Sequence, residues 1–449
     1  MKKLCLSLCL IIVLAASLGA CAPAATIAAP QPTAAQPPAQ PTPQPVIVKE
    51  TVVVPPTAAP QGPVTLTFWH AYNETSAENK MLTETLIPLF EKEHPNIKIQ
   101  SLSVPYEDFR RKLITAISGG VAPDLIRSDI IWVPELADMG ALVALDQQMP
   151  DFNDLKAKVF PGPLSTNFWK EHYYGLPLDT NTKVWLYNKE LYAVAGTTAP
   201  AKNISELEGQ CQALKATKKD AYLFATDGTF AWTVLPWIWS MGGNILDPQM
   251  TKATGYLNGP KTVATYELWL KMFSDGCMAP VVLGNGVDVW NGFAQDIYAN
   301  LDNGPWTYPI IQTQYPDKKI YASAFPAGEA GSIDVVGGED VNLFQQSQHK
   351  QEAMEFIRFL LSSEYQLKMA ETGQIPVLLE AANSDYMKSH PYYPVFMEQL
   401  KTARARPAHP SWAKMDEYLT EAGQLILRKE MTPQQALDQA AAKIDALLK

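Results

Sequence analysis

Residues 64–129 read VTLTFWHAYNETSAENKMLTETLIPLFEKEHPNIKIQSLSVPYEDFRRKLITAISGGVAPDLIRSD, and this stretch decides the fold. Apolar and polar residues alternate from Val64 to Phe68, which is typical of a strand. Thr75 and Glu78 then have the spacing of a capping box, and apolar residues recur at helical spacing beyond them. The stretch therefore opens with a strand that leads into a helix.

The same alternation continues along the stretch. A second strand begins at residues 97–99, apolar positions in 109–117 line one face of a second helix, and residues 125–126 predict a third strand. Strands and helices that alternate at this short spacing predict a parallel sheet with helices on both faces. Trp69 and His70 then lie at the carboxyl end of the first strand, where open α/β sheets bind ligands.

Length and charge limit the possible classes of protein. The 386 residues of 64–449 exceed a single core of usual size, so we expect two domains or lobes. The formal net charge of the chain is −10. This acidic balance argues against nucleic acid as a partner, because such binding depends on Lys and Arg contacts to phosphate.

The first residues have the layout of a secretory signal. Residues 1–20 contain two lysines, an apolar run and small residues, which predicts a signal peptide. The sequence LGAC at 18–21 resembles the lipobox of bacterial lipoproteins, in which the cysteine, here Cys21, is lipidated and becomes the mature N-terminus. The alternative is an ordinary secreted protein with a cysteine at this position. Removing residues 1–20 deletes two lysines and no acid, which changes the charge from −10 to −12.

Residues 22–63 have the composition of a tether. They contain 12 prolines in 42 residues and only two charged side chains. Such a segment cannot bury enough apolar surface to offset the entropy lost on ordering, so we expect it to be disordered. At about 3.1 Å per residue for Pro-rich chain, its reach is at most about 130 Å.

Two cysteines remain after processing. Cys5 and Cys9 leave with the signal peptide and Cys21 takes the lipid, so Cys211 and Cys277 are left. In an oxidising compartment two such cysteines often pair, which predicts a disulfide. Two separate buried thiols are the alternative.

Five segments resemble one known family. They are TLTFWHAYNETSAENKMLTETLIPLFEKEHPNIKIQ (65–100), APDLIRSDIIWVPELADMGALVALD (122–146), YYGLPLDTNTKVWLYNKELY (173–192), NGPWTYPII (303–311) and KQEAMEFIRFLLSSEYQLKMAETGQIPV (350–377). These segments are similar, in order, to successive blocks of the extracellular solute-binding proteins of family 1, which include the maltose-binding proteins of ABC importers. The resemblance covers nearly all of residues 64–449.

The resemblance implies an α/β fold of the periplasmic-binding-protein type, with two discontinuous α/β lobes joined by hinge crossovers (type II) and the ligand between the lobes. Carried onto this chain, the N-terminal lobe comprises 64–177 plus 327–376. The C-terminal lobe comprises 178–326 plus 377–449.

Tryptophans supply the residue-level argument for a sugar ligand. A pyranose has an apolar face of C–H groups and an edge of hydroxyls, so its receptor needs flat aromatic rings and bidentate polar side chains. The chain has 11 tryptophans, and Trp185 and Trp269 lie in periodic segments that predict packing roles. Those beside Gly, Pro or loop signals are candidate ligand residues, with core packing as the alternative: Trp69, Trp232, Trp237, Trp306 and Trp412.

Polar candidates follow the same logic. Asp129 and Trp132 lie just past the third strand, where the similar maltose-binding proteins place sugar-contacting residues. Asp179 and Asn181 lie in the first crossover, which resembles the family segment that carries a ligand carboxylate. The position that matches this carboxylate is Asn181, which is an amide. We therefore expect Asp179 to take the role of the carboxylate. Five further candidates are His70, Tyr72, Gly243, Gly338 and Arg406. Gly338 would let backbone amides approach the ligand, with a turn as the alternative. Arg406 is expected to pair with hydroxyls or with an acid, with a surface role as the alternative, and an ordinary loop role is the alternative for His70.

The function implied is a lipid-anchored, extracytoplasmic and monomeric receptor that passes a carbohydrate, best maltose or a maltooligosaccharide, to the permease of an ABC transporter. No catalytic residue, cofactor or metal is expected, because the six histidines lack metal spacing and common catalytic motifs are missing. A ligand that touches both lobes favours their closed form. The rival hypotheses are another ligand such as a glycerol phosphodiester or a polyamine, a structural or adhesive lipoprotein, and a glycosidase with carboxylates about 5–9.5 Å apart.

Overall fold

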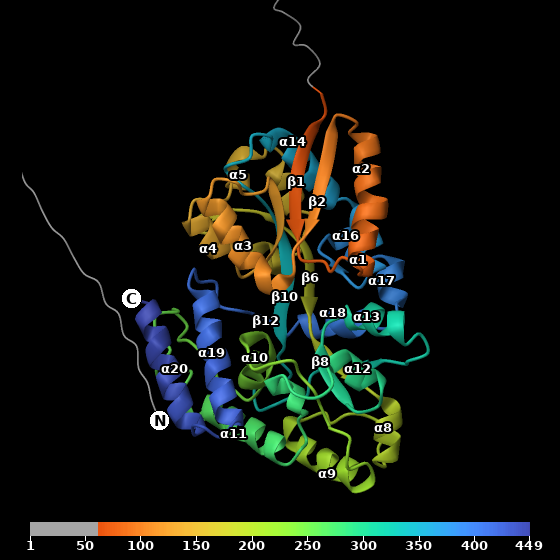
Figure 1. Ribbon diagram of the computed structural model, residues 1–449, viewed down its shortest axis with the longest axis vertical. Coiled ribbons are helices and arrows are strands. Elements are labelled where there is room, and N and C mark those ends of the chain that lie inside the picture. The colour runs from red at the N-terminus through yellow and green to blue at the C-terminus, as the bar shows by residue number, and fades with distance from the viewer. Residues whose placement is uncertain (1–61) are drawn as a thin grey trace, which may run out of the picture. The chain divides into compact units, whose positions relative to one another are not determined.

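A computed structural model describes residues 62–449, which belong to one compact unit that begins at Pro60 (Figure 1). The predicted signal peptide, Cys21 and nearly all of the predicted tether lie outside the described residues. Among the helices of residues 62–449, none combines the length and apolar character that a membrane span requires.

A mixed sheet organises the first part of the unit. Its strand order is β11-β6-β10-β3-β1-β2, and β12 pairs with β10. The strands are β1 (Val64–His70), β2 (Ile97–Ser103), β3 (Leu125–Asp129), β6 (Leu176–Thr182), β10 (Val335–Leu343), β11 (Ile375–Pro376) and β12 (Arg404–Ala405). Strand β1 runs parallel to β2 and β3, which confirms the predicted strand-helix alternation. Strand β10 is antiparallel to β3 and β6, so the sheet is not wholly parallel.

The first helix begins one residue later than the capping-box pattern predicts. The side chain of Ser76 accepts a hydrogen bond from the Asn79 backbone N–H at 3.2 Å and caps α1 (Ala77–Lys80). Thr75 instead donates its hydroxyl to Asn73 Oδ1 at 3.0 Å, so it stabilises the preceding turn. The helix continues through a π-helical segment, η1 (Met81–Leu86), into α2 (Ile87–Glu93).

Hydrophobic cores cover both faces of this sheet. Successive residues of a strand point to opposite faces, so Leu125 packs in a core with Phe68 and Phe356, whereas Ile126 packs in a second core with Phe109. The helices and hairpin around these cores are α3 (Tyr106–Ser118), α4 (Val133–Asp138), α5 (Leu145–Gln148), α6 (Phe152–Lys156), α7 (Pro161–Ser165), β4 (Phe168–Trp169), β5 (His172–Tyr173), α14 (Lys350–Leu360), α15 (Ser363–Ala370) and α16 (Leu379–Ala382).

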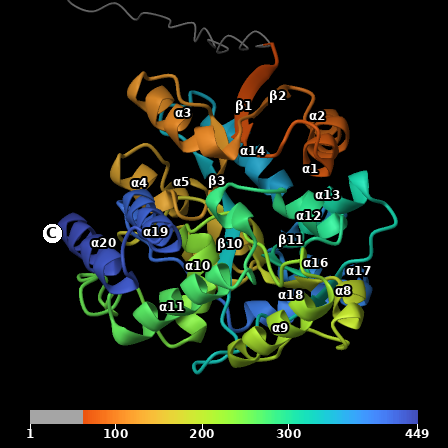
Figure 2. The ribbon, with the colours of Figure 1, turned by 60° about the horizontal axis from the view of Figure 1, so that its bottom comes forward.

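The second part of the unit is mostly helical around a small antiparallel sheet, β8-β7-β9. In Figures 1 and 2, α19 and α20 lie side by side next to α11, and the three helices contact one another. The elements are β7 (Val184–Tyr187), α8 (Lys189–Val194), η2 (Ile204–Glu206), α9 (Leu207–Thr217), α10 (Ala231–Ser240), α11 (Pro260–Ser274), η3 (Pro280–Leu283), α12 (Val289–Ala294), β8 (Asn300–Asn303), α13 (Thr307–Gln314), β9 (Tyr321–Ser323), α17 (Asp385–Ser389), α18 (Tyr393–Leu400), α19 (Trp412–Leu427) and α20 (Pro433–Leu447).

The core of this part settles the role of four tryptophans. Trp185 and Trp269 are buried in it, which confirms their predicted packing roles. Trp237 and Trp412 are each 1% exposed in the same core, so the prediction that they contact a ligand is wrong. Trp237 is buried because α10 is apolar around almost its whole circumference. Among the residues of α10, only Trp232 is not fully buried.

A disulfide joins Cys211, in α9, to Cys277, with a Cα–Cα distance of 5.6 Å. This is the pair that the sequence predicts. The disulfide ties α9 to the segment that precedes η3, and both cysteines are buried in the core of the second part.

The chain passes between the two sets of cores at Lys183, between β6 and β7, and again within β10, where Val335 packs with the second set and Val341 with the first. Val377 and Leu378 pack with the first set, although the predicted boundary places residues from 377 onward in the C-terminal lobe. Because the backbone contacts of residues 60–449 do not divide this unit further, the lobe boundaries stay a prediction.

Candidate functional site

Three acidic side chains lie in a row across the main sheet. Glu339 of β10 is paired in register with Asp129 of β3 on one side and with Asp179 of β6 on the other. Adjacent carboxylates repel one another when ionised. This row therefore needs nearby cations or protons to be stable in the folded protein.

Arg127, the first cation of the row, is 5% exposed and reaches two of the acids. Its Nε and Nη2 donate to Asp179 Oδ2 at 3.2 and 2.9 Å, and its Nη2 lies 2.7 Å from Glu339 Oε2. Gln374 accepts a further hydrogen bond from Nη2 at 3.3 Å, and the guanidinium lies 4.2 Å from the centre of the Tyr72 ring. A buried arginine with these partners is fully compensated, so it is not a free anion site.

The pKa of Glu339 is shifted by its surroundings. Burial raises the pKa of Glu339 well above its usual range; Arg127 acts in the opposite direction, and the nearby Asp179 acts with burial. A neutral Glu339 adds no negative charge to the row, which the two arginines then share with Asp129 and Asp179.

A second arginine, Arg406, binds the acid at the other end of the row. Arg406 Nη2 donates to Asp129 Oδ1 at 3.0 Å, and both side chains are at most 10% exposed. The other oxygen of Asp129 accepts the hydroxyl of Tyr106 at 2.7 Å. The Arg406 guanidinium lies 5.2 Å from the centre of the Trp232 ring, which brings the charged row next to an aromatic surface.

Two half-buried indole rings form that surface. The rings of Trp232 and Trp306 lie 6.3 Å apart with planes 30° from parallel. A side chain at Gly337 would meet the Trp232 ring at 2.6 Å, and one at Gly304 would meet the Trp306 ring at 2.2 Å. Glycine at these two positions therefore lets each indole lie directly against the backbone.

A buried charge cluster supports Trp232 at the crossovers. Lys183 is fully buried, forms an ion pair with Asp302 and lies 5.6 Å from the centre of the Trp232 ring. Asp334 is buried beside them, and burial together with Asp302 raises the pKa of Asp334 well above its usual range. Burial also raises the pKa of Asp302, against the effect of Lys183.

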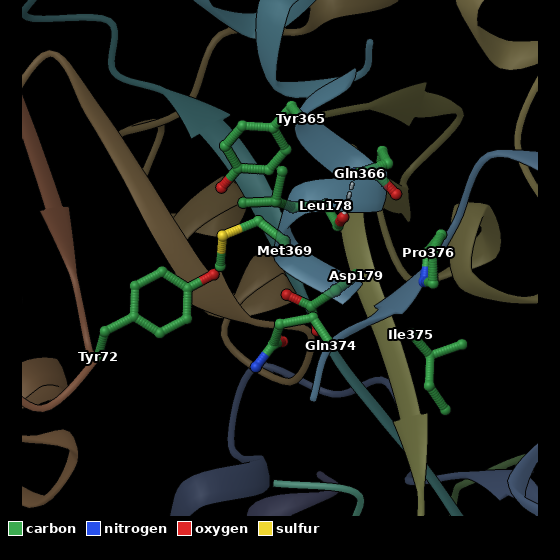
Figure 3. Close-up of a pocket in the computed structure, with 9 residues that line it drawn as sticks. All are labelled: Tyr72, Leu178, Asp179, Tyr365, Gln366, Met369, Gln374, Ile375 and Pro376. Carbon is green, nitrogen blue, oxygen red and sulfur yellow. Dashed lines mark hydrogen bonds between the residues drawn. The ribbon is translucent and has the colours of Figure 1, made fainter. Parts of the chain in front are cut away.

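Several buried polar atoms in or beside the row have no hydrogen-bond partner among residues 62–449: Asp179 Oδ1, Asn181 Oδ1, Glu339 Oε2 and Arg406 Nε. Buried polar atoms normally find a partner on protein, water or ligand. Figure 3 shows Asp179 and Gln374 pointing into one small pocket, with Tyr72 on its other side. This pocket has a volume of about 10 Å³, which holds no more than a water molecule.

Half of the predicted ligand residues lie in this constellation. Asp129 and Asp179 belong to the row, Tyr72 packs on Arg127, and the others lie beside them: Asn181, Trp232, Trp306 and Arg406. His70 does not face it, because its side chain is fully buried and its Nε2 contacts Ser101 Oγ at 2.7 Å. Burial and then Arg127 lower the pKa of His70 to about 3, so the imidazole stays neutral. Because the imidazole is fully buried, the prediction that His70 contacts a ligand is wrong.

Four other candidates have packing or backbone roles. Trp69 is half-buried against Phe109, and Trp132 is 4% exposed in the same core, so packing explains both. Gly338 is buried in β10 opposite Thr180, where φ is +137°, so it serves the close approach of two strands and does not offer a free amide to a ligand. Gly243 follows α10, and a side chain there would meet Thr262 Oγ1 at 2.6 Å, so it serves helix packing.

Sequence reasoning missed Tyr106, Arg127, Lys183 and Glu339. Arg127 and Glu339 carried a usable signal, because a charged residue inside an apolar strand needs a buried partner. Tyr106 carried none, since its role depends on Asp129 and Trp132 from another segment. Within residues 62–449, His, Cys, Asp and Glu form no group of three that could hold a metal ion.

Comparison with known proteins places the chain in a family. Residues 72–367 match the family described as bacterial extracellular solute-binding protein. A binding protein of Brucella abortus is 30% identical over 382 residues, which cover 84% of this chain and 92% of the relative. The multiple sugar-binding protein of Streptococcus mutans is 23% identical over 82% of this chain and 87% of its own length.

Among solved structures, the fold is similar to the GacH receptor of Streptomyces glaucescens, which has been crystallised unliganded and with acarbose. The TM-score is 0.79 at 22% identity, and the match covers 86% of this chain and 99% of that receptor. This likeness shows the two-lobed α/β fold of sugar-binding proteins. The chain belongs to the bacterial extracellular solute-binding protein family.

Proposed function

We propose that this protein captures a neutral carbohydrate beside the Trp232 and Trp306 rings. The observation that carries the proposal is the facing indole pair next to a charge-compensated row of acids and arginines. Indole rings suit the C–H face of a pyranose, and hydroxyls both donate and accept hydrogen bonds. Such hydroxyls match the unpartnered acceptors of Asp179 and Asn181 and the unpartnered donor of Arg406.

The charge balance favours a neutral ligand over the charged alternatives. Arg127 is held by the side chains of Asp179 and Glu339 and Arg406 by that of Asp129, so a phosphate group would have to displace one of these side chains from either arginine. A polyamine needs a surplus of ionised acid, and the raised pKa of Glu339 reduces that surplus. The sugar-binding function of the Streptococcus mutans relative supports the same choice.

Maltose or a maltooligosaccharide is the ligand that we propose first, because residues 130–146 resemble the maltose-binding branch of the family. Trp232, Trp306 and Arg406 belong to the predicted C-terminal lobe, and Asp129 to the predicted N-terminal lobe. A sugar that contacts both groups binds the closed form better than the open form, and this difference drives closure. The closed monomer then delivers the sugar to an ABC transporter permease.

The test is a titration of the purified protein with maltose, maltotriose, mannotriose, galactotriose, glycerol 3-phosphate and spermidine. Tryptophan fluorescence and calorimetry report binding, and chromatography checks that the sugars remain intact. We expect micromolar binding of at least one neutral sugar, equivalent to about 8 kcal/mol, and loss of that binding in Trp232→Ala and Trp306→Ala. Trp290→Phe, in α12, is the matched control and should bind normally. Binding of spermidine or glycerol 3-phosphate alone would overturn the choice of ligand.

We further propose that the protein is held at the extracytoplasmic face of the cell membrane by a lipid on Cys21. The proposal is supported by the LGAC sequence at 18–21 and by membership of an extracellular family. Wild-type protein expressed in a bacterial host should sediment with membranes and incorporate labelled palmitate. Cys21→Ser should do neither while retaining its sugar affinity. Equal membrane association of both proteins would contradict the anchor.

A further inference from the structure

Tyr106, the first residue of α3, is an aromatic side chain whose exposure is unusual. It is 45% exposed, although its hydroxyl is already satisfied by Asp129 Oδ2 at 2.7 Å. The polar end of the side chain is therefore bound to the protein, while the residue as a whole stays 45% exposed. An exposed aromatic surface beside a polar site is a common mark of a binding surface.

Two contacts hold the Tyr106 ring in place. It stacks on the Trp132 ring with centres 5.7 Å apart and planes 25° from parallel. Trp132 is itself 4% exposed and packs edge-on against Phe109 at 5.4 Å. One face of Tyr106 is thus covered by a rigid neighbour, and its hydroxyl fixes the rotation of the ring. The ring is therefore held in one orientation before any ligand binds, which lowers the entropy cost of binding.

The same hydroxyl links Tyr106 to the indole pair. Asp129 accepts Tyr106 through Oδ2 and Arg406 through Oδ1, and the Arg406 guanidinium lies 5.2 Å from the centre of the Trp232 ring. Two residues therefore connect the Tyr106 ring with the Trp232 ring. Tyr106 belongs to the predicted N-terminal lobe and Trp232 to the predicted C-terminal lobe, so the two aromatic surfaces lie on opposite sides of the Asp129–Arg406 ion pair.

We propose that Tyr106 is a specificity-determining residue of the carbohydrate site: its free face receives the C–H face of a pyranose from the side of the predicted N-terminal lobe. This inference rests on the proposed function and deepens it. Aromatic surfaces contributed by both lobes suit sugars that present C–H groups on both ring faces. Pyranoses with equatorial hydroxyls meet this condition, whereas an axial hydroxyl makes one face polar.

The test compares three variants by calorimetry with the tightest-binding neutral sugar of the panel of maltose, maltotriose, mannotriose and galactotriose. Tyr106→Ala and Tyr106→Leu should each lose at least tenfold in affinity, because neither offers a flat ring. Tyr106→Phe keeps the ring and should stay within about threefold of wild type. Affinity that Phe retains and Leu loses would show that the aromatic ring stacks on the sugar and does not merely fill space. Tyr256→Ala, at a tyrosine that is 37% exposed outside the site, should bind normally.

The outcomes separate this inference from the proposed function. If wild type binds a sugar and Tyr106→Ala and Tyr106→Leu bind it within twofold of wild type, Tyr106 is not a platform, although the carbohydrate function stands. If Tyr106→Phe loses as much affinity as Tyr106→Ala, the hydroxyl and not the ring matters, and the inference is overturned. If wild type binds none of these sugars, both proposals fall. Melting temperatures of all variants within about 3 °C of wild type show that folding is intact.

Discussion

At the scale of single residues, the site depends on where side chains are missing as much as on where they are present. Gly304 and Gly337 leave the space in which the Trp306 and Trp232 rings lie, and a Cβ atom at either position would come within 2.6 Å of an indole carbon. Real Cβ atoms do not approach that closely, so the ring would have to move. Because aromatic stacking needs contact over the whole ring face, a small displacement is costly.

We therefore expect Gly304→Ala to displace the Trp306 ring and to weaken sugar binding at least tenfold, with a modest loss of stability. Calorimetry gives the affinity, and differential scanning calorimetry gives the melting temperature. Gly209→Ala is the matched control, because Gly209 lies in α9 and a side chain there meets nothing within 4 Å. That control should leave affinity unchanged and stabilise the protein by about 0.5–1 kcal/mol. Normal affinity in Gly304→Ala would show that Trp306 does not stack on the ligand.

At the scale of elements, the crossovers between the two sets of cores carry a buried charge cluster. Lys183 follows β6, Asp302 is in β8, and Asp334 precedes β10, where its carbonyl accepts the Arg404 N–H at 2.8 Å. Replacing one member of a buried ion pair leaves the other charge uncompensated, which costs about 3–5 kcal/mol. The cluster thus ties three separate segments together where the chain crosses.

Lys183→Met should lower the free energy of unfolding by about 3–5 kcal/mol at pH 8. Burial already raises the pKa of Asp302 and of Asp334 in the folded protein, and loss of the ammonium raises both further. An acid with a raised folded pKa stabilises the fold fully below its unfolded pKa and loses that contribution as pH rises through the folded value. The destabilisation should therefore be smaller at pH 5 than at pH 8.

Calorimetric melting at pH 5, 6.5 and 8 checks this expectation. Lys261→Met is the control, because its ion pair with Glu329 is exposed and such pairs are worth at most about 1 kcal/mol. A pH-independent loss of stability in Lys183→Met would show that Asp302 and Asp334 are not the groups that titrate.

The disulfide between Cys211 and Cys277 is a second element-scale constraint. It closes a loop with a sequence separation of 66, and removing a native disulfide typically costs about 2–5 kcal/mol. We expect the Cys211→Ala/Cys277→Ala variant to lose about that much free energy of unfolding and therefore to melt at a lower temperature. A reducing agent should lower the melting temperature of wild type toward that of the variant and leave the variant unchanged. Equal melting temperatures without reductant would mean that the bond adds no stability.

At the scale of the whole molecule, the Arg406–Asp129 ion pair joins segments that the family resemblance assigns to different lobes. The pair is at most 10% exposed, so little water competes with it. It uses the same side chains that we propose for the sugar. We therefore expect Arg406 to contribute both to the approach of the two predicted lobes and to ligand binding.

We expect Arg406→Gln to increase the radius of gyration of the unliganded protein and to weaken sugar binding at least tenfold. Small-angle scattering with and without the sugar that binds wild type measures the first effect, and calorimetry measures the second. Arg428→Gln, at an exposed position after α19, is the control and should change neither. An unchanged radius in Arg406→Gln would mean that the ion pair does not hold the lobes together.

Sequence alone predicted the first strands and helices, the packing of Trp185 and Trp269, and the pairing of the two cysteines. These features depend on local periodicity, or on which cysteines remain after processing. Sequence also led to the family, because five segments resemble successive blocks of the family in the same order. Each of these inferences needs only residues that are near one another or counted along the chain.

Only the tertiary structure decided which candidates meet. Hydrophobic periodicity shows that α10 is apolar, but not that Trp237 packs against Trp185 while Trp232 stays half-buried beside Trp306. The row of Asp129, Glu339 and Asp179 arises from strand register between segments far apart in sequence. Register is set by the packing of whole strands, and the compensation of buried charge follows from it. Neither the strand register nor the compensation of buried charge can be read from composition or spacing.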